Sequence, residues 1–190
     1  MKLVTVSGPR GAGKEEVMRY LVEAFPAALH RIVPHTTRAP RPGECHGREY
    51  YFVNDVEFDG LFDRGEFIFV NDKMAHQRSG TVRAELTKKS LAVIDITDFG
   101  ARELCSKVVV EGGRALLVFV YASREERRGR IRLRQPSMNE DEVERLLSDD
   151  PVDPLPGAHL DFDLVVENRN GQLNATLDRI GSLIAQFLLL

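Results

Sequence analysis

The 190-residue chain has only two cysteines, Cys45 and Cys105, and this scarcity excludes a framework of disulfides. The sequence also lacks any four-ligand Cys and His pattern with the spacing of a structural zinc site. Neither sign of charge predominates, since the chain has 26 Lys and Arg and 29 Asp and Glu, for a formal net charge of −3. A dedicated nucleic-acid binder is normally basic, so we expect no nucleic-acid partner.

Long hydrophobic runs are absent as well. The apolar run at Leu3–Ser7 meets a glycine-rich segment at once, and the apolar Ser182–Leu190 is too short to cross a bilayer. We therefore expect no signal peptide, no membrane partner and a cytoplasmic location. With 43% hydrophobic and 29% charged residues, the chain has the composition of a globular protein. Its length is enough to bury a core.

Short apolar runs alternate with amphipathic segments along the chain. This alternation predicts an α/β fold in which helices cover both faces of a parallel sheet, a three-layer core. The block from about Pro34 to Gly80 breaks the alternation and could be an inserted subdomain. Strands are predicted at Leu3–Ser7, Ile32–Thr37, Tyr50–Val53, Phe67–Asn71, Leu91–Ile96, Arg114–Tyr121 and Phe162–Val166, helices at Glu15–Phe25, Asp55–Phe62, Thr81–Lys89, Ala101–Val109, Arg124–Arg134, Glu140–Ser148 and Gln172–Leu189, and loops at Arg38–Gly47 and Asp149–Pro156.

The segment Gly8–Lys14, with the sequence GPRGAGK, matches the phosphate-loop spacing G-x-x-x-x-G-K. It follows a predicted strand and opens a predicted helix, which is the context that this motif requires. Glycines there let successive backbone N–H groups surround a phosphate, and Lys14 would contact the β- and γ-phosphates. The segment therefore predicts a P-loop NTPase-type core that binds a nucleoside triphosphate.

Position 15 departs from this motif, which has Ser or Thr there to bind Mg²⁺ through a hydroxyl. The chain has Glu15, followed by Glu16. A carboxylate can bind Mg²⁺, but it also repels phosphate oxygens. Alternatively, Glu15 faces solvent and only stabilises the N-terminus of the helix. The sequence leaves both interpretations open.

The segments Pro34–Glu44 (PHTTRAPRPGE) and Gly47–Val53 (GREYYFV) closely resemble the acceptor-binding segment of guanylate kinases. The family pattern there is roughly S-x-T-T-R-x-P-R-x-G-E, then G-x-x-Y-x-F-V. The resemblance covers nearly the whole chain, continuing through Val56–Phe58, Gly65–Ile68, Gly80–Val82, Ile94–Ile96 and Asp163–Asn168. It implies one domain over residues 1–190, with a core at 1–33 and 81–190, an acceptor-binding insertion at about 34–80 and a helical lid at about 124–148.

The resemblance implies an enzyme that uses ATP and Mg²⁺ to phosphorylate a nucleoside monophosphate, converting GMP to GDP. Arginines in the acceptor loop would bind the acceptor phosphate through paired hydrogen bonds. Lid arginines one helical turn apart would neutralise the charge on the transferring phosphoryl group. The implied catalytic residues are Lys14, Arg38, Arg130 and Arg134; the ATP-binding residues are Gly8, Arg10, Gly11, Ala12, Gly13, Lys14, Glu15 and Asn168; the acceptor-binding residues are Arg38, Arg41, Tyr50, Gly80, Thr81 and Asp95; and Asp95 is also the implied Mg²⁺ ligand.

The residues at the positions that would bind the guanine base differ from those of the family. Pro34 and Phe69 stand where the family has Ser and Glu, and Thr97 replaces a second carboxylate. A pocket that loses hydrogen-bonding partners loses discrimination between bases. Two alternatives therefore stay open: a kinase for a sugar-phosphate acceptor such as a ribose bisphosphate, and a catalytically weak or inactive module that binds a phosphorylated ligand. The sequence does not distinguish a monomer from a dimer.

Overall fold

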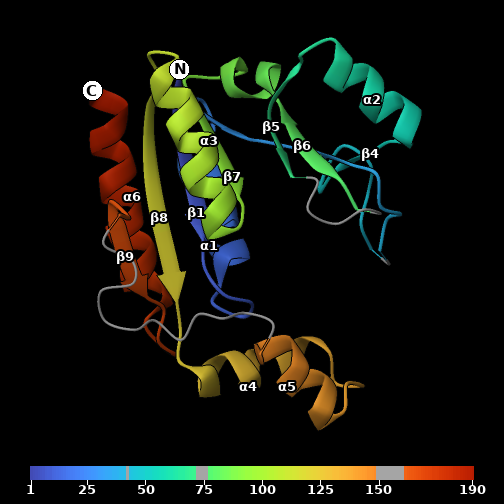
Figure 1. Ribbon diagram of the computed structural model, residues 1–190. Helices are drawn as coiled ribbons and strands as arrows, with labels where there is room; N and C mark the ends of the chain where they lie inside the picture. Colours follow the sequence, from blue (N-terminus) through green and yellow to red (C-terminus); the bar gives the residue numbers. More distant parts are fainter. Residues whose placement is uncertain (42, 72–76, 149–160) are drawn as a thin grey trace.

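The computed structural model describes residues 1–41, 43–71, 77–148 and 161–190, and the predicted loop Asp149–Pro156 lies outside them. The chain has the predicted α/β fold, built around a five-stranded sheet in which every pair of neighbours is parallel (Figure 1). The strand order is β2-β7-β1-β8-β9. The strands are β1 (Lys2–Ser7), β2 (Leu29–Arg31), β7 (Leu91–Asp95), β8 (Arg114–Tyr121) and β9 (Leu164–Glu167).

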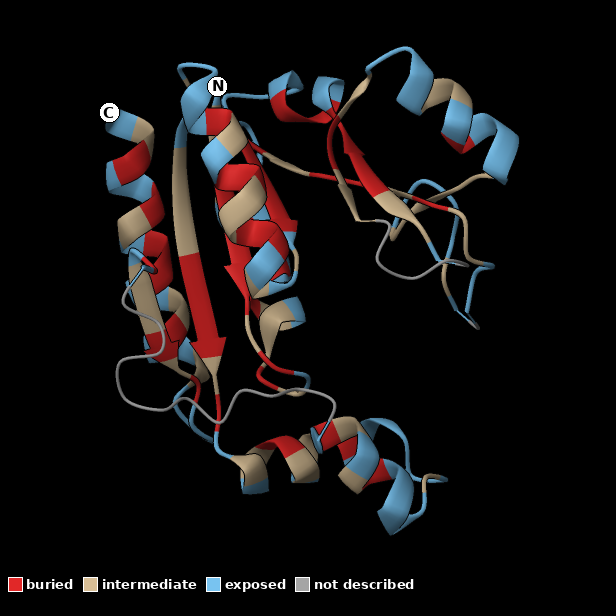
Figure 2. Cartoon of the chain, in the orientation of Figure 1, coloured by how far each residue is buried: buried red, intermediate tan, exposed pale blue. Residues whose placement is uncertain are grey.

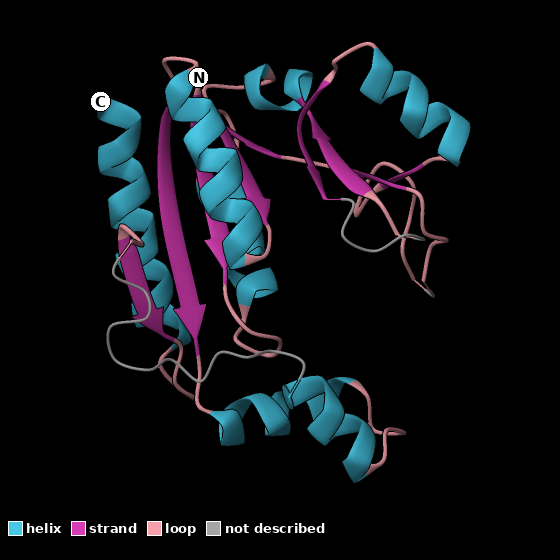
Figure 3. Cartoon of the chain, in the orientation of Figure 1, coloured by secondary structure: helices cyan, strands magenta, loops and turns pink. Residues whose placement is uncertain are grey.

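Helices cover both faces of this central sheet, as Figure 3 shows. On one face α1 (Lys14–Ala24) and α6 (Leu173–Leu189) share a core with the sheet, and alternate residues such as Val4 and Val6 of β1 point into it. On the other face α3 (Asp98–Val110) packs over Leu3, which has the opposite orientation on the same strand. The two clusters account for most of the buried positions in Figure 2. The strands are thus buried on both sides, which explains their continuous apolar runs.

The part of the chain between β2 and β7 forms a second, four-stranded sheet with the order β4-β3-β6-β5. Ile68 and Phe69 of this sheet join the core under α3, so the two sheets share apolar contacts. Asn54 begins the helix of this region with a capping box, in which Asn54 and Glu57 satisfy each other's backbone N–H groups. The elements are β3 (His35–Thr36), β4 (Tyr51–Phe52), α2 (Asp55–Asp63), β5 (Phe67–Asn71), β6 (Ser79–Val82) and the 3₁₀ helix η1 (Arg83–Thr87).

Two helices, α4 (Arg124–Arg134) and α5 (Glu140–Ser148), follow β8 and lie beyond the carboxyl ends of the central strands (Figure 1). They pack on each other through a small cluster made by Ile131, Val143 and Leu147. Because this cluster is separate from the two large ones, the helical pair has its own core.

Two predicted elements near the second sheet were wrong. The strand expected at Ile32–Thr37 is split: Ile32 still donates to Val93 O at 2.8 Å, but Val33 donates to Glu85 Oε2 at 3.1 Å. Pro34 has no N–H, so the chain leaves the central sheet there. The helix expected at Thr81–Lys89 is instead the end of β6 and the short η1. Pairing of β6 with β5 overrides the helical spacing of that segment.

Both cysteines are free thiols. Cys105 is buried under the sheet near Thr5, and this burial raises the pKa of its thiol to about 11. A thiol that stays protonated is a poor nucleophile, which agrees with a packing role for Cys105. No helix among the described residues is both long and apolar enough to cross a membrane.

Candidate active site

The phosphate loop connects β1 to α1 at the carboxyl edge of the central sheet. In open parallel sheets this edge is where ligands bind. Gly8 has a φ of 145°, and a Cβ there would lie 1.9 Å from the carbonyl oxygen of Val120. Gly13 has a φ of 99°, and its Cβ would lie 2.2 Å from Asn168 Nδ2. Only glycine fits at these two positions, because both the backbone conformation and the space exclude a side chain.

Lys14 is folded back over its own loop. Its ammonium group donates to Gly8 O at 2.8 Å and to Pro9 O at 3.4 Å. Across the loop, the buried side chain of Asn168 at the end of β9 donates to Ala12 O at 2.8 Å. The loop is therefore held in place by contacts with its own lysine and with β9.

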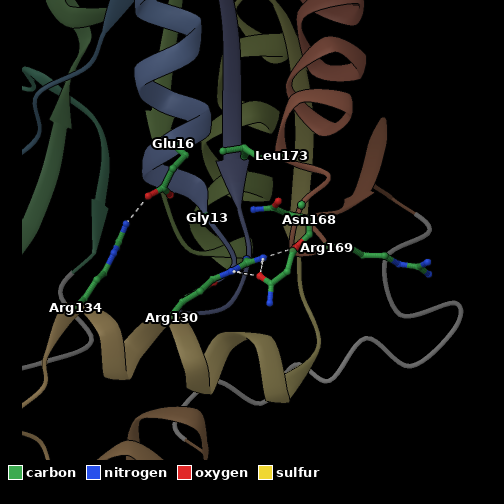
Figure 4. Close-up of a pocket in the computed structure, with 10 residues that line it drawn as sticks. Gly13, Glu16, Arg130, Arg134, Asn168, Arg169 and Leu173 are labelled. Atoms are coloured by element: carbon green, nitrogen blue, oxygen red, sulfur yellow. Dashed lines mark hydrogen bonds and ion pairs between the residues drawn. The ribbon is translucent and has the colours of Figure 1, made fainter.

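A pocket of about 270 Å³, which we call the α4 pocket, lies between the phosphate loop, α4 and the turn from β9 to α6 (Figure 4). Arg130 crosses it, donating to Gly11 O at 3.2 Å, Asn168 O at 2.7 Å and Asn170 Oδ1 at 3.0 Å. Arg130 therefore ties α4 to the loop. The lining residues are Gly11, Gly13, Glu16, Arg130, Arg134, Asn168, Arg169, Asn170, Gly171 and Leu173.

Arg134 lies one turn further along α4 and approaches α1 instead. Its guanidinium donates to Glu16 Oε1 at 2.6 Å, the ion pair drawn at the left of Figure 4. The other oxygen of this carboxylate, Glu16 Oε2, is buried without a hydrogen-bond partner. Arg134 and Glu16 thus bridge the two helices at the mouth of the α4 pocket.

A second pocket of about 420 Å³, which we call the β6 pocket, opens on the other side of the phosphate loop. Lys14 and Arg10 line it from the loop and Asp95 from the end of β7, while Tyr50 lies just before β4 and Thr81 lies in β6. Gly80, the neighbour of Thr81, instead packs against Phe67 and does not line this pocket. The other lining residues are Gly8, Pro34, Phe69, Asn71, Ser79, Ile94, Ile96 and Thr97.

Arg38 is held beside the β6 pocket by a bidentate ion pair. Its two terminal nitrogens donate to Glu44 at 2.6 and 2.7 Å, and its guanidinium lies 4.8 Å from the centre of the Tyr50 ring. The hydrogen bond from Arg38 lowers the pKa of Glu44 to about 2. Arg41 contributes its backbone N–H to the same carboxylate. Neither arginine lines the β6 pocket in this conformation.

Asp95 and Glu15 are the carboxylates next to Lys14. Asp95 is exposed to the β6 pocket, although the protein around it excludes enough water to raise the pKa of its carboxyl group, an effect that Lys14 and Arg31 partly offset. Glu15 lines neither pocket and is paired with Arg31 of β2 at 2.9 and 3.1 Å. Within the described ranges no cluster of three or more His, Cys, Asp or Glu side chains could hold a metal.

Several residues of the site carry no sequence motif. Glu16 and Asn170 line the α4 pocket, Asn71 and Ser79 line the β6 pocket, and Arg31 is paired with Glu15. A carboxylate directly after the phosphate loop is the one signal that could have indicated Glu16. The others come together only through the fold.

Known proteins resemble this chain in sequence and in fold. The family model for guanylate kinase matches residues 1–187. The chain belongs to the guanylate kinase family. This membership makes it a nucleotide-binding phosphotransferase.

Curated relatives agree with this membership, and a solved structure shares the fold. The guanylate kinase of Chlamydia felis is 38% identical over 153 residues, which cover 76% of this chain and 71% of that protein. The guanylate kinase of Porphyromonas gingivalis is 32% identical over 192 residues and 98% of both chains. The crystal structure of guanylate kinase from Anaplasma phagocytophilum has a TM-score of 0.64 at 23% identity, covering 99% of this chain and 86% of that one. This last likeness shows the shared fold.

Proposed function

We propose that this chain transfers the terminal phosphoryl group of ATP to the phosphate of GMP, forming ADP and GDP. The observation that supports this most is the position of the phosphate loop between two pockets, with Lys14 lining one and Gly13 the other. A phosphoryl donor on one side and an acceptor on the other would meet at Lys14. Phosphoryl transfer needs this positioning, together with stabilisation of the charge that spreads over the transferring group.

In this proposal the α4 pocket takes the nucleoside of ATP. Gly8, Arg10, Gly11, Ala12 and Gly13 surround its phosphates with backbone N–H groups, and Lys14 neutralises their charge. Asn168 keeps the loop in shape through its bond to Ala12 O. Arg130 and Arg134 are the lid cations that turn toward the transferring phosphoryl group, which requires Arg134 to leave Glu16.

The β6 pocket takes the acceptor. Arg38 and Arg41, which lie outside the pocket in this conformation, turn into it to bind the acceptor phosphate together with the Tyr50 hydroxyl. Thr81 borders the nucleoside, and Gly80 lets its strand pack closely on Phe67 beside it. Glu44 orients Arg38 for this task, because a bidentate pair fixes the plane of the guanidinium. Asp95 lies where donor and acceptor phosphates would meet.

Mg²⁺, which the family implies, would be held by Asp95 and by the phosphates themselves. Mg²⁺ is commonly bound by one or two carboxylates plus substrate phosphates, so the single exposed carboxylate of Asp95 fits this ion. When bound, Mg²⁺ would supply positive charge that neutralises the phosphate oxygens. Glu15 is not offered as a ligand, since both of its oxygens accept from Arg31.

We further propose three working parts within the single domain: a core (residues 1–33 and 81–190), an acceptor-binding insertion (about 34–80) and a lid (about 124–148). The lid has its own small core at Ile131, Val143 and Leu147, which lets it move as a unit. Its closure, with that of the insertion, would exclude water from the phosphates.

A coupled assay for ADP tests this function. ATP and Mg²⁺ are supplied with GMP, with the other nucleoside monophosphates and with a ribose bisphosphate in parallel. We expect turnover with GMP and a loss of at least about a hundredfold in Lys14→Ala, since a cation on the transferring group is removed. Lys89→Ala, whose ammonium bonds to Pro26 O away from both pockets, is the matched control and keeps its rate.

A sugar-phosphate acceptor is a second candidate, favoured by one observation. Pro34 and Phe69 line the β6 pocket at positions where a guanine-specific pocket would need side chains that form hydrogen bonds with the base. Turnover with the ribose bisphosphate and none with GMP would support it. No turnover with any acceptor, together with binding of a phosphorylated ligand that Arg38→Ala removes, would contradict both kinase functions and favour a binding module.

A further inference from the structure

The first turn of α1 carries two carboxylates directly after Lys14, namely Glu15 and Glu16. The N-terminus of a helix attracts anions, and the proposed triphosphate site uses this same end of α1. Carboxylates in that turn would therefore compete with phosphates for the same positive potential. An ATP site there is favoured when these charges are offset, and in the proposed transfer only Glu15 keeps its arginine, because Arg134 leaves Glu16.

Each of the two carboxylates is bound to an arginine from a different element. Arg31 donates to both oxygens of Glu15, at 2.9 and 3.1 Å, and Arg134 donates to Glu16 at 2.6 Å. Glu16 and Arg134 line the α4 pocket, whereas Glu15 and Arg31 do not. Arg134 belongs to the lid and has an implied role on phosphate, whereas Arg31 has no role in any motif.

Arg31 is well placed to control the charge beside the phosphate loop. It is the last residue of β2, and it lines a small pocket of about 140 Å³ together with Tyr50, Glu44 and Asp95. The hydrogen bond from Arg31 lowers the pKa of Glu15. Burial opposes the charge of Arg31, but its hydrogen bond to Glu15 raises the pKa of Arg31. Both side chains are thus ionised at neutral pH, and Arg31 also lies within electrostatic range of Asp95.

We propose that Arg31 is a positioning residue of the ATP site, which keeps the Glu15 carboxylate out of both pockets and cancels its charge. This inference rests on the proposed function, because it takes the loop to bind the phosphates of ATP. The motif has a hydroxyl at position 15. In this chain an ion pair of zero net charge, between Glu15 and Arg31, takes its place. Without Arg31, an unpaired negative charge would stand one residue from Lys14.

A double-mutant cycle on the ATP affinity tests this role. The variants are Arg31→Gln, Glu15→Gln and the double variant, and the dissociation constant of ATP is measured by calorimetry next to the KM for ATP and kcat. We expect Arg31→Gln to weaken ATP binding about tenfold, and more at low salt, because an exposed charge is less screened there. Glu15→Gln alone does not weaken binding. The double variant recovers to within about threefold of the wild type, since the repelling charge is gone.

Two outcomes would overturn the proposal. If the double variant binds ATP as weakly as Arg31→Gln, the arginine contacts the nucleotide itself. If Arg31→Gln binds ATP like the wild type, the pair has no part in the site. Should Arg31→Gln not fold, Arg31→Lys keeps the positive charge and is expected to bind ATP within about threefold of the wild type; a tenfold loss would contradict charge cancellation.

Arg83→Gln is the matched control. Arg83 forms an ion pair of similar exposure with Glu111 between η1 and α3, and neither residue lines any of the three pockets. Its ATP affinity and thermal midpoint should stay unchanged. If the wild type binds ATP but phosphorylates no acceptor, the proposed function is contradicted. The double-mutant cycle on ATP affinity can still be measured in that case, so the role of Arg31 is tested separately. The two failures are therefore distinguishable.

Discussion

Gly13 illustrates how backbone geometry at a single residue shapes the phosphate loop beside the α4 pocket. Its φ of 99° excludes a side chain, and so does Asn168, whose Nδ2 lies 2.2 Å from the position that a Cβ would take. We expect Gly13→Ala to lower the free energy of unfolding by about 3 kcal/mol, part from the left-handed backbone and part from the collision. Urea unfolding followed by circular dichroism measures this loss.

Gly112→Ala separates the two contributions. Gly112 also has a positive φ, of 77°, but nothing lies within 4 Å of its Cβ position. This variant should lose only about 1 kcal/mol, the cost of the left-handed backbone. Equal losses of unfolding free energy in Gly13→Ala and Gly112→Ala would show that a Cβ at position 13 does not collide with Asn168 to any effect.

At the scale of elements, α4 is tied to the lining of the α4 pocket by the residues at its first turn. Ser123 and Glu126 form a capping box, and the second oxygen of Glu126 accepts from the backbone N–H of Asn170 at 2.6 Å. Glu126 thus holds both the start of α4 and the turn that lines the α4 pocket. Loss of this carboxylate is therefore expected to affect α4 and the pocket together.

We expect Glu126→Ala to destabilise the protein by about 2 kcal/mol and to raise the KM for ATP, since it removes a cap and a charge-assisted bond to Asn170. Glu57→Ala is the comparison, because Glu57 completes the same kind of capping box at α2, away from the α4 pocket. It should cost about 1 kcal/mol and leave the KM for ATP unchanged. A KM that rises equally in both variants would mean that helix stability alone affects ATP binding.

At the scale of the whole molecule, the phosphate loop lies between two groups of elements that differ in how they meet the core. The second sheet is joined to the core through Ile68 and Phe69, whereas α4 and α5 have a separate cluster and reach the loop through Arg130. Ligands that contact both groups would draw them toward the core.

A bisubstrate analogue, with adenosine and guanosine joined by a polyphosphate, should therefore decrease the radius of gyration. The closed form is expected to approach about 16 Å, the value for a compact chain of this length. Small-angle X-ray scattering measures the change, and ATP alone should produce only part of it. An unchanged radius with the analogue bound would contradict closure of the insertion and lid.

Much of the fold follows from local patterns. The runs at Arg114–Tyr121 and Phe67–Asn71 and the helix at Arg124–Arg134 have the predicted bounds, because apolar continuity and helical spacing mark them without help from distant residues. Local patterns did not predict the split of the strand at Pro34 or the short strand β6. Those elements depend on partners far along the chain, Val93 for Ile32 and β3 for β6.

The sequence by itself determined the family and the position of the phosphate-loop motif, since Gly8–Lys14 and the Thr-Thr-Arg-x-Pro-Arg segment are contiguous motifs. Only the tertiary structure decided how the charges around that loop are paired. Glu15 meets Arg31, Glu16 meets Arg134, and Arg130 meets the loop carbonyls, although 16 to 119 positions separate these partners. Ion pairs form between residues that strands and helices bring within hydrogen-bond distance, and no local spacing records which residues these are.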